Sequence, residues 1–273
     1  MKLPPAARLV ARRVYGARGG ATGDRSIPEE VAIALTYNRH AYATMMASPQ
    51  DFEDFAIGFS LAEGVVAGPA EILDFEIVAL AQGIELRMTI TPGRLRDFTA
   101  RRRHMAGPTG CGLCGIEAVD EAMRPPPAVS TELILQPDQI PRMVAALVAH
   151  QPLNHLTRAV HAAGYWQPQT GLDLVREDVG RHNALDKLAG AVARQHIHGP
   201  GAVVLTSRVS VEMVQKVAVM TAPVVVAVSA PTALAVRMAD TANITLIAIA
   251  RDDGFEVFTH PHRVADRAAS DVA

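Results

Sequence analysis

The sequence has little cysteine, few aromatic residues and no strong excess of charge of either sign. Only two of its 273 residues are cysteines, and aromatic residues make up 4%. Two cysteines cannot build the disulfide framework of a small secreted protein, so a reducing, cytoplasmic location is expected. The formal net charge is −2, whereas nucleic-acid-binding proteins typically have an excess of basic residues. We therefore expect no nucleic-acid partner.

Long hydrophobic runs are also missing. The longest apolar stretch, PVVVAVSAPTALAV, is interrupted by serine and proline and is too short to span a bilayer. The first twenty residues contain scattered arginines and two early prolines, but no apolar segment of the kind found in secretory signals. We therefore expect no membrane insertion. Hydrophobic residues nevertheless make up 49% of the chain, which is enough to fill the core of a globular protein.

The first half of the chain predicts a small α+β unit. The segment VAIALTYNRHAYATMMA at 31–47 is typical of two strands joined by a turn at Asn38. The next segment predicts a helix with Ser48 as its N-cap, phenylalanines at helical spacing and Gly64 at its end. A second pair of strands is predicted around a turn at Gly83.

The second half alternates strands with helices. AVVLTS, APVVVAVSA and ITLIAIA are apolar segments of the kind found in strands buried on both faces, and helical patterns separate them. We therefore predict an α/β domain with a mainly parallel sheet that is covered by helices on both faces. The predicted division of the chain is a disordered basic tail at 1–25, an N-terminal α+β domain at 26–100, a mobile CxxC loop with a proline-rich connector at 101–130, a C-terminal α/β domain at 131–265 and a tail at 266–273.

Polar residues follow three of the predicted strands in the second half. Arg208, Ser229 and Arg251 each lie at or just after the end of an apolar strand segment. Parallel strands joined by right-handed crossovers point the same way, so these residues are expected to meet at one edge of the sheet. Arginines and helix N-termini suit an anion such as a phosphate. The alternative is that the arginines are solvated at the rim, and that Ser210 and Thr232 only cap helices.

The densest polar run of this half is REDVGRHNALDK, at 176–187. Asn183 is predicted to be the N-cap of the helix that follows. The run carries more charges than a helix cap needs, and Arg181 and His182 are therefore candidate site residues. His161 lies on a strand that is expected to pair with this run and is a second candidate, although a single histidine in a strand is more often structural.

Both cysteines lie in GPTGCGLCGIE, as Cys111 and Cys114, each next to glycine. A structural zinc site needs four ligands, and no second ligand pair follows, so no metal is expected. The glycines also match GxGxxG, but no apolar strand leads into them, which argues against a dinucleotide-binding turn. A redox pair and a reactive thiol on a flexible loop stay open, since the arginine-rich run before the loop would lower a thiol pKa.

These motifs occur in an order that resembles the FdhD family. The resemblance rests on the Cys-Gly-x-Cys-Gly loop, REDVGRHNALDK, EMVQK, AVSAPTALAV and FTHPHR, and on DFAIGFSLAEG in the first half. It extends over about residues 28–263, and EDVGRHNALDK is its most specific part. The resemblance implies a cytidine-deaminase-like fold without zinc for the C-terminal domain, and it implies a homodimer.

The resemblance also implies an activity. Members of the family take sulfane sulfur from a cysteine desulfurase as a cysteine persulfide on the CxxC loop. They pass it to the molybdenum, or tungsten, of bis-molybdopterin guanine dinucleotide, which is then inserted into formate dehydrogenase. Cys111 is the predicted persulfide carrier, and Cys114 assists release or shares the sulfur. The alternatives are a non-catalytic chaperone that binds the molybdenum cofactor and a thiol–disulfide oxidoreductase.

The sheet edge, the polar run and the resemblance together give a predicted cofactor site. Its predicted residues are Ile249, Ala250, Arg251, Asp252, Asp253, Gly254, Arg208, Ser229, His182, Arg181 and His161. The sequence departs from the family in two loops: TRAVH stands where Thr-Gly-Gly-x-His is common, and TSR stands where Ser-Gly-Arg is common. Because the added Cβ atoms restrict the backbone, the shape of the nucleotide pocket is left open.

Overall fold

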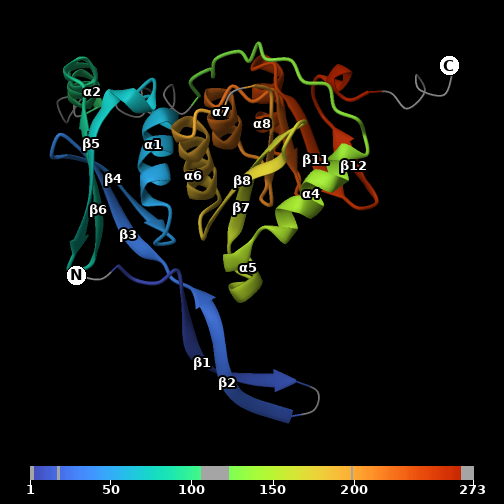
Figure 1. Ribbon diagram of the computed structural model, residues 1–273, viewed down its shortest axis with the longest axis horizontal. Helices are drawn as coiled ribbons and strands as arrows, with labels where there is room; N and C mark the ends of the chain where they lie inside the picture. The colour runs from blue at the N-terminus through green and yellow to red at the C-terminus, as the bar shows by residue number, and fades with distance from the viewer. Residues whose placement is uncertain (1–2, 17–18, 106–122, 198, 266–273) are drawn as a thin grey trace.

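The computed structural model describes residues 3–16, 19–105, 123–197 and 199–265. Two sheets and a separate hairpin make up the described fold, and Figure 1 shows the hairpin projecting away from the two sheets. Cys111 and Cys114 lie outside the described residues, as does the predicted tail at 266–273.

The sheet of the first half has four strands in the order β4-β3-β6-β5. The strands are β3 (Val31–Tyr37), β4 (His40–Ala47), β5 (Ile72–Leu80) and β6 (Gly83–Ile90). Asn38 and Arg39 have φ angles of 48° and 67°, as a tight two-residue hairpin turn requires. The predicted strand pairs that turn at Asn38 and beside Gly83 are both confirmed.

Helix α1 (Phe52–Ala62) packs into the core of this sheet. Phe55 and Phe59 lie in the core with Tyr37, because their spacing of four residues places both on one face of the helix. The helix is followed by Gly64 at a φ of 63°, which confirms the predicted end. The 3-10 helix η1 (Pro69–Glu71) and helix α2 (Pro92–Met105) complete this half.

The sheet of the second half has six strands in the order β12-β11-β10-β9-β7-β8. The strands are β7 (His161–Gln167), β8 (Gly171–Asp178), β9 (Ala202–Leu205), β10 (Val224–Ala227), β11 (Thr245–Arg251) and β12 (Gly254–Val257). The helices are α4 (Gln139–Ala149), α5 (Pro152–Thr157), α6 (Arg181–Arg194), α7 (Val211–Val219), α8 (Ala233–Thr241) and the 3-10 helix η2 (Pro261–Arg263).

Helices cover both faces of the six-stranded sheet, as predicted. Alternate residues of each strand point to opposite faces. Val203 and Val225 pack with α6, α7 and α8, whereas Val204 and Val226 pack with α4. The central strands are therefore buried on both sides, which explains their unbroken apolar sequences.

The sheet is mixed. The prediction of a mainly parallel sheet holds for its centre and is wrong for the strands toward its two edges. β9, β10 and β11 run parallel, but β7 is antiparallel to both β8 and β9, and β12 is antiparallel to β11. The reason is the length of the connections. A short turn joins β7 to β8 and another joins β11 to β12, and a parallel pair needs a long crossover.

Residues 7–28 were predicted to lie mainly in a disordered tail, but the structure forms a hairpin of β1 (Ala7–Gly16) and β2 (Gly19–Pro28). The pairing is regular from Ala7 opposite Pro28 to Gly16 opposite Gly19. The prediction failed because a segment rich in arginine and glycine that contributes no residue to a hydrophobic core has the composition of a disordered tail. Its order comes from backbone pairing, which composition does not report.

The two halves meet where α1 crosses α6. A Cβ atom on Gly58 would lie 1.7 Å from the carbonyl oxygen of Asp186, and one on Gly190 would lie 1.8 Å from that of Asp54. Two glycines therefore let the helix backbones touch. The buried Asp54 carboxylate accepts hydrogen bonds from Arg176 Nε at 2.8 Å and Arg194 Nε at 2.9 Å, which joins α1 to β8 and α6.

Candidate functional site

The loops that follow β9 and β10 lie side by side at one edge of the six-stranded sheet. The backbone N–H of Thr232 donates to the carbonyl of Val209 at 3.0 Å, and Val209 and Pro231 form an isolated parallel bridge. The N–H of Ile249, near the end of β11, contacts the carbonyl of Ser229 at 3.4 Å. The loops after β9 and β10 therefore meet at one edge beside the last residues of β11, as the predicted parallel directions of these strands require.

The reversed strand β7 brings a fourth segment to this edge. The N–H of Thr206 donates to the carbonyl of Ala162 at 3.1 Å, and the N–H of Ala162 donates to Thr206 Oγ1 at 2.9 Å. Because β7 is antiparallel to β9, its first residue, His161, lies beside the loop that follows β9. His161 is also opposite Asp178 at the end of β8, so the start of α6 joins the same edge.

Asp178 shapes the turn that carries Arg181 and His182. Its Oδ1 atom accepts hydrogen bonds from the N–H of Gly180 at 2.8 Å and from Asn183 Nδ2 at 3.0 Å. The predicted N-cap, Asn183, is wrong: Gly180 holds the N-cap position, and Asn183 lies within the first turn of α6. Asn183 Nδ2 also donates to the carbonyl of Met46 at 2.8 Å, so this side chain ties the turn to the first half of the chain.

Ser48 is bound to the same turn, and the prediction that it caps α1 is wrong. Its N–H donates to Asp178 Oδ2 at 2.9 Å, its Oγ accepts the N–H of Val179 at 3.1 Å, and its carbonyl accepts Lys187 Nζ at 3.0 Å. Asp51 holds the N-cap position of α1, with a φ of 55°. Ser48 cannot also cap the helix because its polar groups are engaged across the interface.

A fully buried ion pair completes this network. Lys187 Nζ lies 2.7 Å from Asp178 Oδ2, and both side chains have an exposed fraction of 0%. Asp178 accepts donors from Ser48, Gly180, Asn183 and Lys187, so its buried charge is well compensated. The polar run therefore has a structural part, formed by Asp178, Asn183 and Lys187, and a second part, Arg181 and His182, that lies at the sheet edge.

The histidines at the edge are only partly exposed, and their surroundings disfavour their charged forms. Burial lowers the pKa of His161, and the nearby Arg181 guanidinium lowers it further. Burial also lowers the pKa of His182, while the carboxylate of Glu212, with Oε2 2.7 Å from His182 Nε2, acts in the opposite direction. A neutral imidazole can donate one hydrogen bond through its N–H and accept another at its second ring nitrogen.

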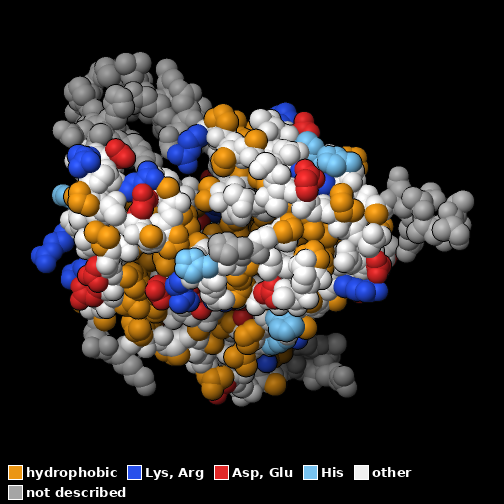
Figure 2. Space-filling model, turned by 45° about the horizontal axis from the view of Figure 1, so that its top comes forward, with side chains coloured by type: hydrophobic (Ala, Val, Ile, Leu, Met, Phe, Trp, Pro, Cys, Tyr) orange, Lys and Arg blue, Asp and Glu red, His pale blue; other side chains and the backbone are white. Residues whose placement is uncertain are grey.

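The positive charge at this edge is local. Arg208 and Arg251 are exposed, and Arg181 is half-buried. On the face drawn in Figure 2, basic and acidic side chains are interspersed with hydrophobic ones and form no field of a single sign. Recognition of an anion at this edge would thus depend on these few arginines and on backbone N–H groups near the starts of α6 and α7.

The residues of the predicted segment 249–254 lie in two different environments, one buried and one exposed. Ile249 has a φ of 53° and sits where the register of β11 and β12 shifts, and Ala250 is fully buried in the core. Ala250 could therefore contact a ligand only through its backbone. The remaining predicted residues of this segment form an exposed turn between the two strands: Arg251, Asp252, Asp253 and Gly254.

Sequence reasoning missed one residue of this edge, Glu212 at the start of α7. It belongs to the EMVQK motif, but nothing local to that motif indicated a histidine partner 30 residues earlier. In the described part of the chain, no group of three or more histidine, cysteine, aspartate or glutamate side chains is arranged to hold a metal ion. No helix among the described residues is long and apolar enough to cross a membrane.

The structure is that of a mixed α/β protein with two larger sheets, and its sequence carries a CxxC pair. The chain belongs to the FdhD/NarQ family, whose model matches residues 28–265. It is 50% identical over 94% of its length to a protein from Agrobacterium fabrum named Sulfur carrier protein FdhD, of which 96% is covered. A protein of the same name from Brucella abortus is 49% identical over 89% of this chain, and 91% of that protein is covered. Another from Xanthomonas campestris is 45% identical over 93% of this chain, and 92% of that protein is covered.

The fold has a counterpart among solved structures. A crystal structure of a proposed formate dehydrogenase accessory protein from Desulfotalea psychrophila matches with a TM-score of 0.76 and 25% sequence identity. The match covers 96% of this chain and 100% of the other. The resemblance read from the motifs is thus confirmed at the level of family, and the mixed α/β fold is shared. The finer likeness to cytidine deaminases stays a prediction.

Proposed function

We propose that this protein is a sulfur carrier that serves the maturation of formate dehydrogenase. The observation that carries the proposal is the 50% identity, over 94% of the chain, to a protein named Sulfur carrier protein FdhD. The CxxC pair supplies the thiols that sulfur transfer requires. A cytoplasmic location and a homodimer belong to the same proposal.

The proposed first step is a thiol exchange. The Cys111 thiolate attacks the terminal sulfur of a persulfide on the cysteine desulfurase, so the donor's S–S bond breaks and a new one forms on Cys111. The desulfurase cysteine leaves as a thiolate. In the proposed release step, the Cys114 thiol attacks the inner sulfur of the Cys111 persulfide, which gives a Cys111–Cys114 disulfide and frees one hydrosulfide equivalent for the metal. A cellular dithiol then reduces the disulfide.

The sulfur acceptor in this proposal is the molybdenum of bis-molybdopterin guanine dinucleotide, bound as a substrate at the sheet edge. Arg181, Arg208 and Arg251 would pair with its phosphates, because guanidinium groups bind phosphate oxygens with charge-assisted hydrogen bonds. His161 and His182, with their lowered pKa values, would offer neutral donors or acceptors. The other proposed contacts come from Ser229 and from the segment 249–254.

Mass spectrometry of the protein after incubation with a cysteine desulfurase and cysteine tests the carrier function. We expect the peptide that contains Cys111 to gain one sulfur atom, and we expect Cys111→Ala to abolish both this gain and formate dehydrogenase maturation. Cys114→Ala is the matched control: it should keep the gain but slow the release.

Two other outcomes would replace the proposal. A reversible Cys111–Cys114 disulfide with no sulfur gain would favour a thiol–disulfide oxidoreductase. Full maturation of formate dehydrogenase in cells that contain only the Cys111→Ala variant would favour a chaperone that binds the cofactor without carrying sulfur.

A further inference from the structure

Two ion pairs join the first turns of α6 and α7. His182 Nε2 on α6 lies 2.7 Å from Glu212 Oε2 on α7, and one turn further along, Asp186 Oδ1 lies 2.6 Å from Lys216 Nζ. His182 and Asp186 are four residues apart on one helix, and Glu212 and Lys216 are four residues apart on the other, so each helix presents its two residues on one face. The two helices therefore run in the same direction where they meet.

The inner of these pairs fixes the position of the outer one. The side chains of Asp186 and Lys216 are exposed by only 1% and 12%, and a buried pair is costly to break. Those of His182 and Glu212 are exposed by 27% and 61%. An exposed pair contributes too little to hold two helices in register. The place of Glu212 beside His182 is therefore set by the buried pair one turn away.

The contact between His182 and Glu212 suits a protonated ring. Oε2 is within reach of Nε2, but the two atoms are not aligned as a hydrogen bond, and Nε2 is shielded from solvent. Such a contact attracts through charge more than through direction. A neutral imidazole gains little from it, whereas an imidazolium gains a close counter-charge.

The other charged groups around His182 act against protonation. Burial lowers the pKa of His182, and the carboxylate of Glu212 opposes this effect. Arg181 on the same helix, Lys216 on α7 and His161 on β7 each lower the pKa further, because they disfavour a second positive charge nearby. Among these neighbours, Glu212 is the one that favours the charged ring.

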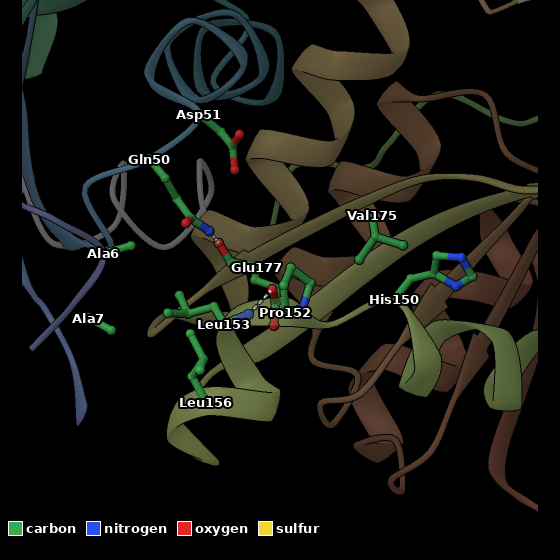
Figure 3. A pocket seen from close by; sticks show the side chains of 10 residues that line it. All are labelled: Ala6, Ala7, Gln50, Asp51, His150, Pro152, Leu153, Leu156, Val175 and Glu177. Atoms are coloured by element: carbon green, nitrogen blue, oxygen red, sulfur yellow. Dashed lines mark hydrogen bonds between the residues drawn. The ribbon is translucent and has the colours of Figure 1, made fainter. Parts of the chain in front are cut away.

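The acidic residues at the end of β8 are directed elsewhere. Side chains alternate along a strand, so Glu177 and Asp178 point to opposite faces of the sheet. Glu177 accepts N–H groups at the start of α5 and lines a pocket of about 540 Å³, as Figure 3 shows. Asp178 is paired with Lys187. Of these three carboxylates, Glu212 is the one that contacts His182.

We propose that Glu212 is a positioning residue for His182, and that His182 takes up a proton when a phosphate group binds at the sheet edge. The inference rests on the proposed cofactor site and adds a residue and a proton to it. The proton comes from the solvent and binds the neutral imidazole, which becomes an imidazolium. Glu212 takes the Nε2 side of the ring, which leaves Nδ1 to bind the phosphate.

The direction of proton movement follows from the charges. In the free protein the surroundings of His182 lower its pKa, and a bound phosphate raises it again because the charges are opposite. At a pH between the two values the ring is neutral before binding and charged afterwards. By linkage, the affinity for the phosphate group therefore falls as the pH rises through this range.

Isothermal titration calorimetry of the full chain with GDP, the guanine end of the proposed cofactor, tests this proposal. Titrations at about pH 6.5, the ordinary pKa of histidine, in buffers of different ionisation enthalpy give the number of protons taken up per GDP bound. We expect the wild type to take up several tenths of a proton more than His182→Asn. The titration of GDP itself is common to all variants and cancels in this comparison.

Substitutions of Glu212 separate its charge from its shape. Glu212→Gln should lose more than about half of this extra uptake and should lower the pH of largest uptake by about half a unit or more. Glu212→Asp keeps the charge and should retain most of the uptake. Glu76→Gln on β5 is the matched control and should change nothing, since Glu76 is exposed by 63% and lies 3.6 Å from an arginine.

NMR titration of the His182 ring decides the question even if His182→Asn folds poorly. The pKa of this ring should rise when GDP is added to the wild type, and in free Glu212→Gln it should be lower than in the free wild type. GDP binding with no proton gained by His182, or with equal uptake in Glu212→Gln, would overturn the inference and leave the sulfur carrier function standing. Failure of GDP to bind would overturn it together with the proposed cofactor site.

Discussion

The buried ion pair between Lys187 and Asp178 gives a quantitative prediction for Lys187→Met. Methionine fills nearly the same volume, so little of the cost should come from a cavity. The variant leaves the Asp178 carboxylate buried without its cation and removes the donor to the carbonyl of Ser48. Breaking a buried pair in this way costs about 3–5 kcal/mol. We expect the lower end, about 3 kcal/mol, because Asp178 keeps hydrogen bonds from Ser48, Gly180 and Asn183.

The free energy of unfolding from urea titrations followed by circular dichroism measures this cost. Arg142→Met is the matched control, since Arg142 Nη2 lies 2.8 Å from Asp138 Oδ2 but the two side chains are exposed by 76% and 50%. That exposed pair should contribute no more than about 0.5 kcal/mol.

A second substitution separates the stranded charge from other effects. Adding Asp178→Asn to Lys187→Met should recover part of the lost stability, with a coupling energy above about 1 kcal/mol in the double-mutant cycle. If the free energy of unfolding of Lys187→Met lies within about 1 kcal/mol of the wild-type value, the ion pair does not stabilise the interface and the reasoning fails.

Two further predictions concern the sheet edge and the pH dependence of stability. GDP, the guanine end of the proposed cofactor, should raise the melting temperature, with about 2.7 kcal/mol of stabilisation at a hundred times its dissociation constant. Arg181→Met should remove most of this shift and Arg142→Met none, and no shift at saturating GDP would contradict the proposed site. Burial raises the pKa of Asp186 from 3.8 to about 6 beside Lys216, so the folded protein binds more protons than the unfolded chain between these values. The stability of the wild type relative to Asp186→Asn should therefore fall by about 3 kcal/mol as the pH rises from 4 to 7, and parallel pH profiles in urea titrations would refute this.

Local sequence patterns predicted the elements well where the structure depends on near neighbours. The turn at Asn38 follows from residues that accept positive φ, and the layers of the second half follow from the alternation of apolar strands with helices. The convergence at the sheet edge could also be predicted, because strand direction follows from connectivity for β9, β10 and β11. The family could be recognised because its motifs occur in a fixed order.

The roles of Ser48 and Asn183 could not be predicted from neighbouring residues. Both are good N-cap residues, and the preference for serine or asparagine at a helix start is the same whether or not a distant partner competes. Ser48 binds Asp178, and Asn183 binds Met46 besides the nearby Asp178, so each has a partner more than 100 residues away in the sequence. A polar residue near a helix start is therefore weak support for a cap when the fold brings another charged segment to it.

Arg263 is a similar case at the end of the chain. The FTHPHR motif helped to identify the family, and its last residue is Arg263. The structure buries Arg263 completely, and its Nη1 atom donates to the carbonyl of Asn243 at 3.0 Å. Part of what makes these motifs specific is thus internal structure and not contact with a ligand.

The threefold attachment of Ser48 has a consequence for motion. Its N–H, hydroxyl and carbonyl all bond to the turn between β8 and α6 or to Lys187, and the glycines of α1 and α6 hold the helix backbones in contact nearby. Separation of the halves at this joint would leave the three polar groups of Ser48 without their partners, and would remove one donor from the buried charge of Asp178. The two halves should therefore unfold in one cooperative transition, and any rearrangement during sulfur delivery would carry them together as a rigid unit.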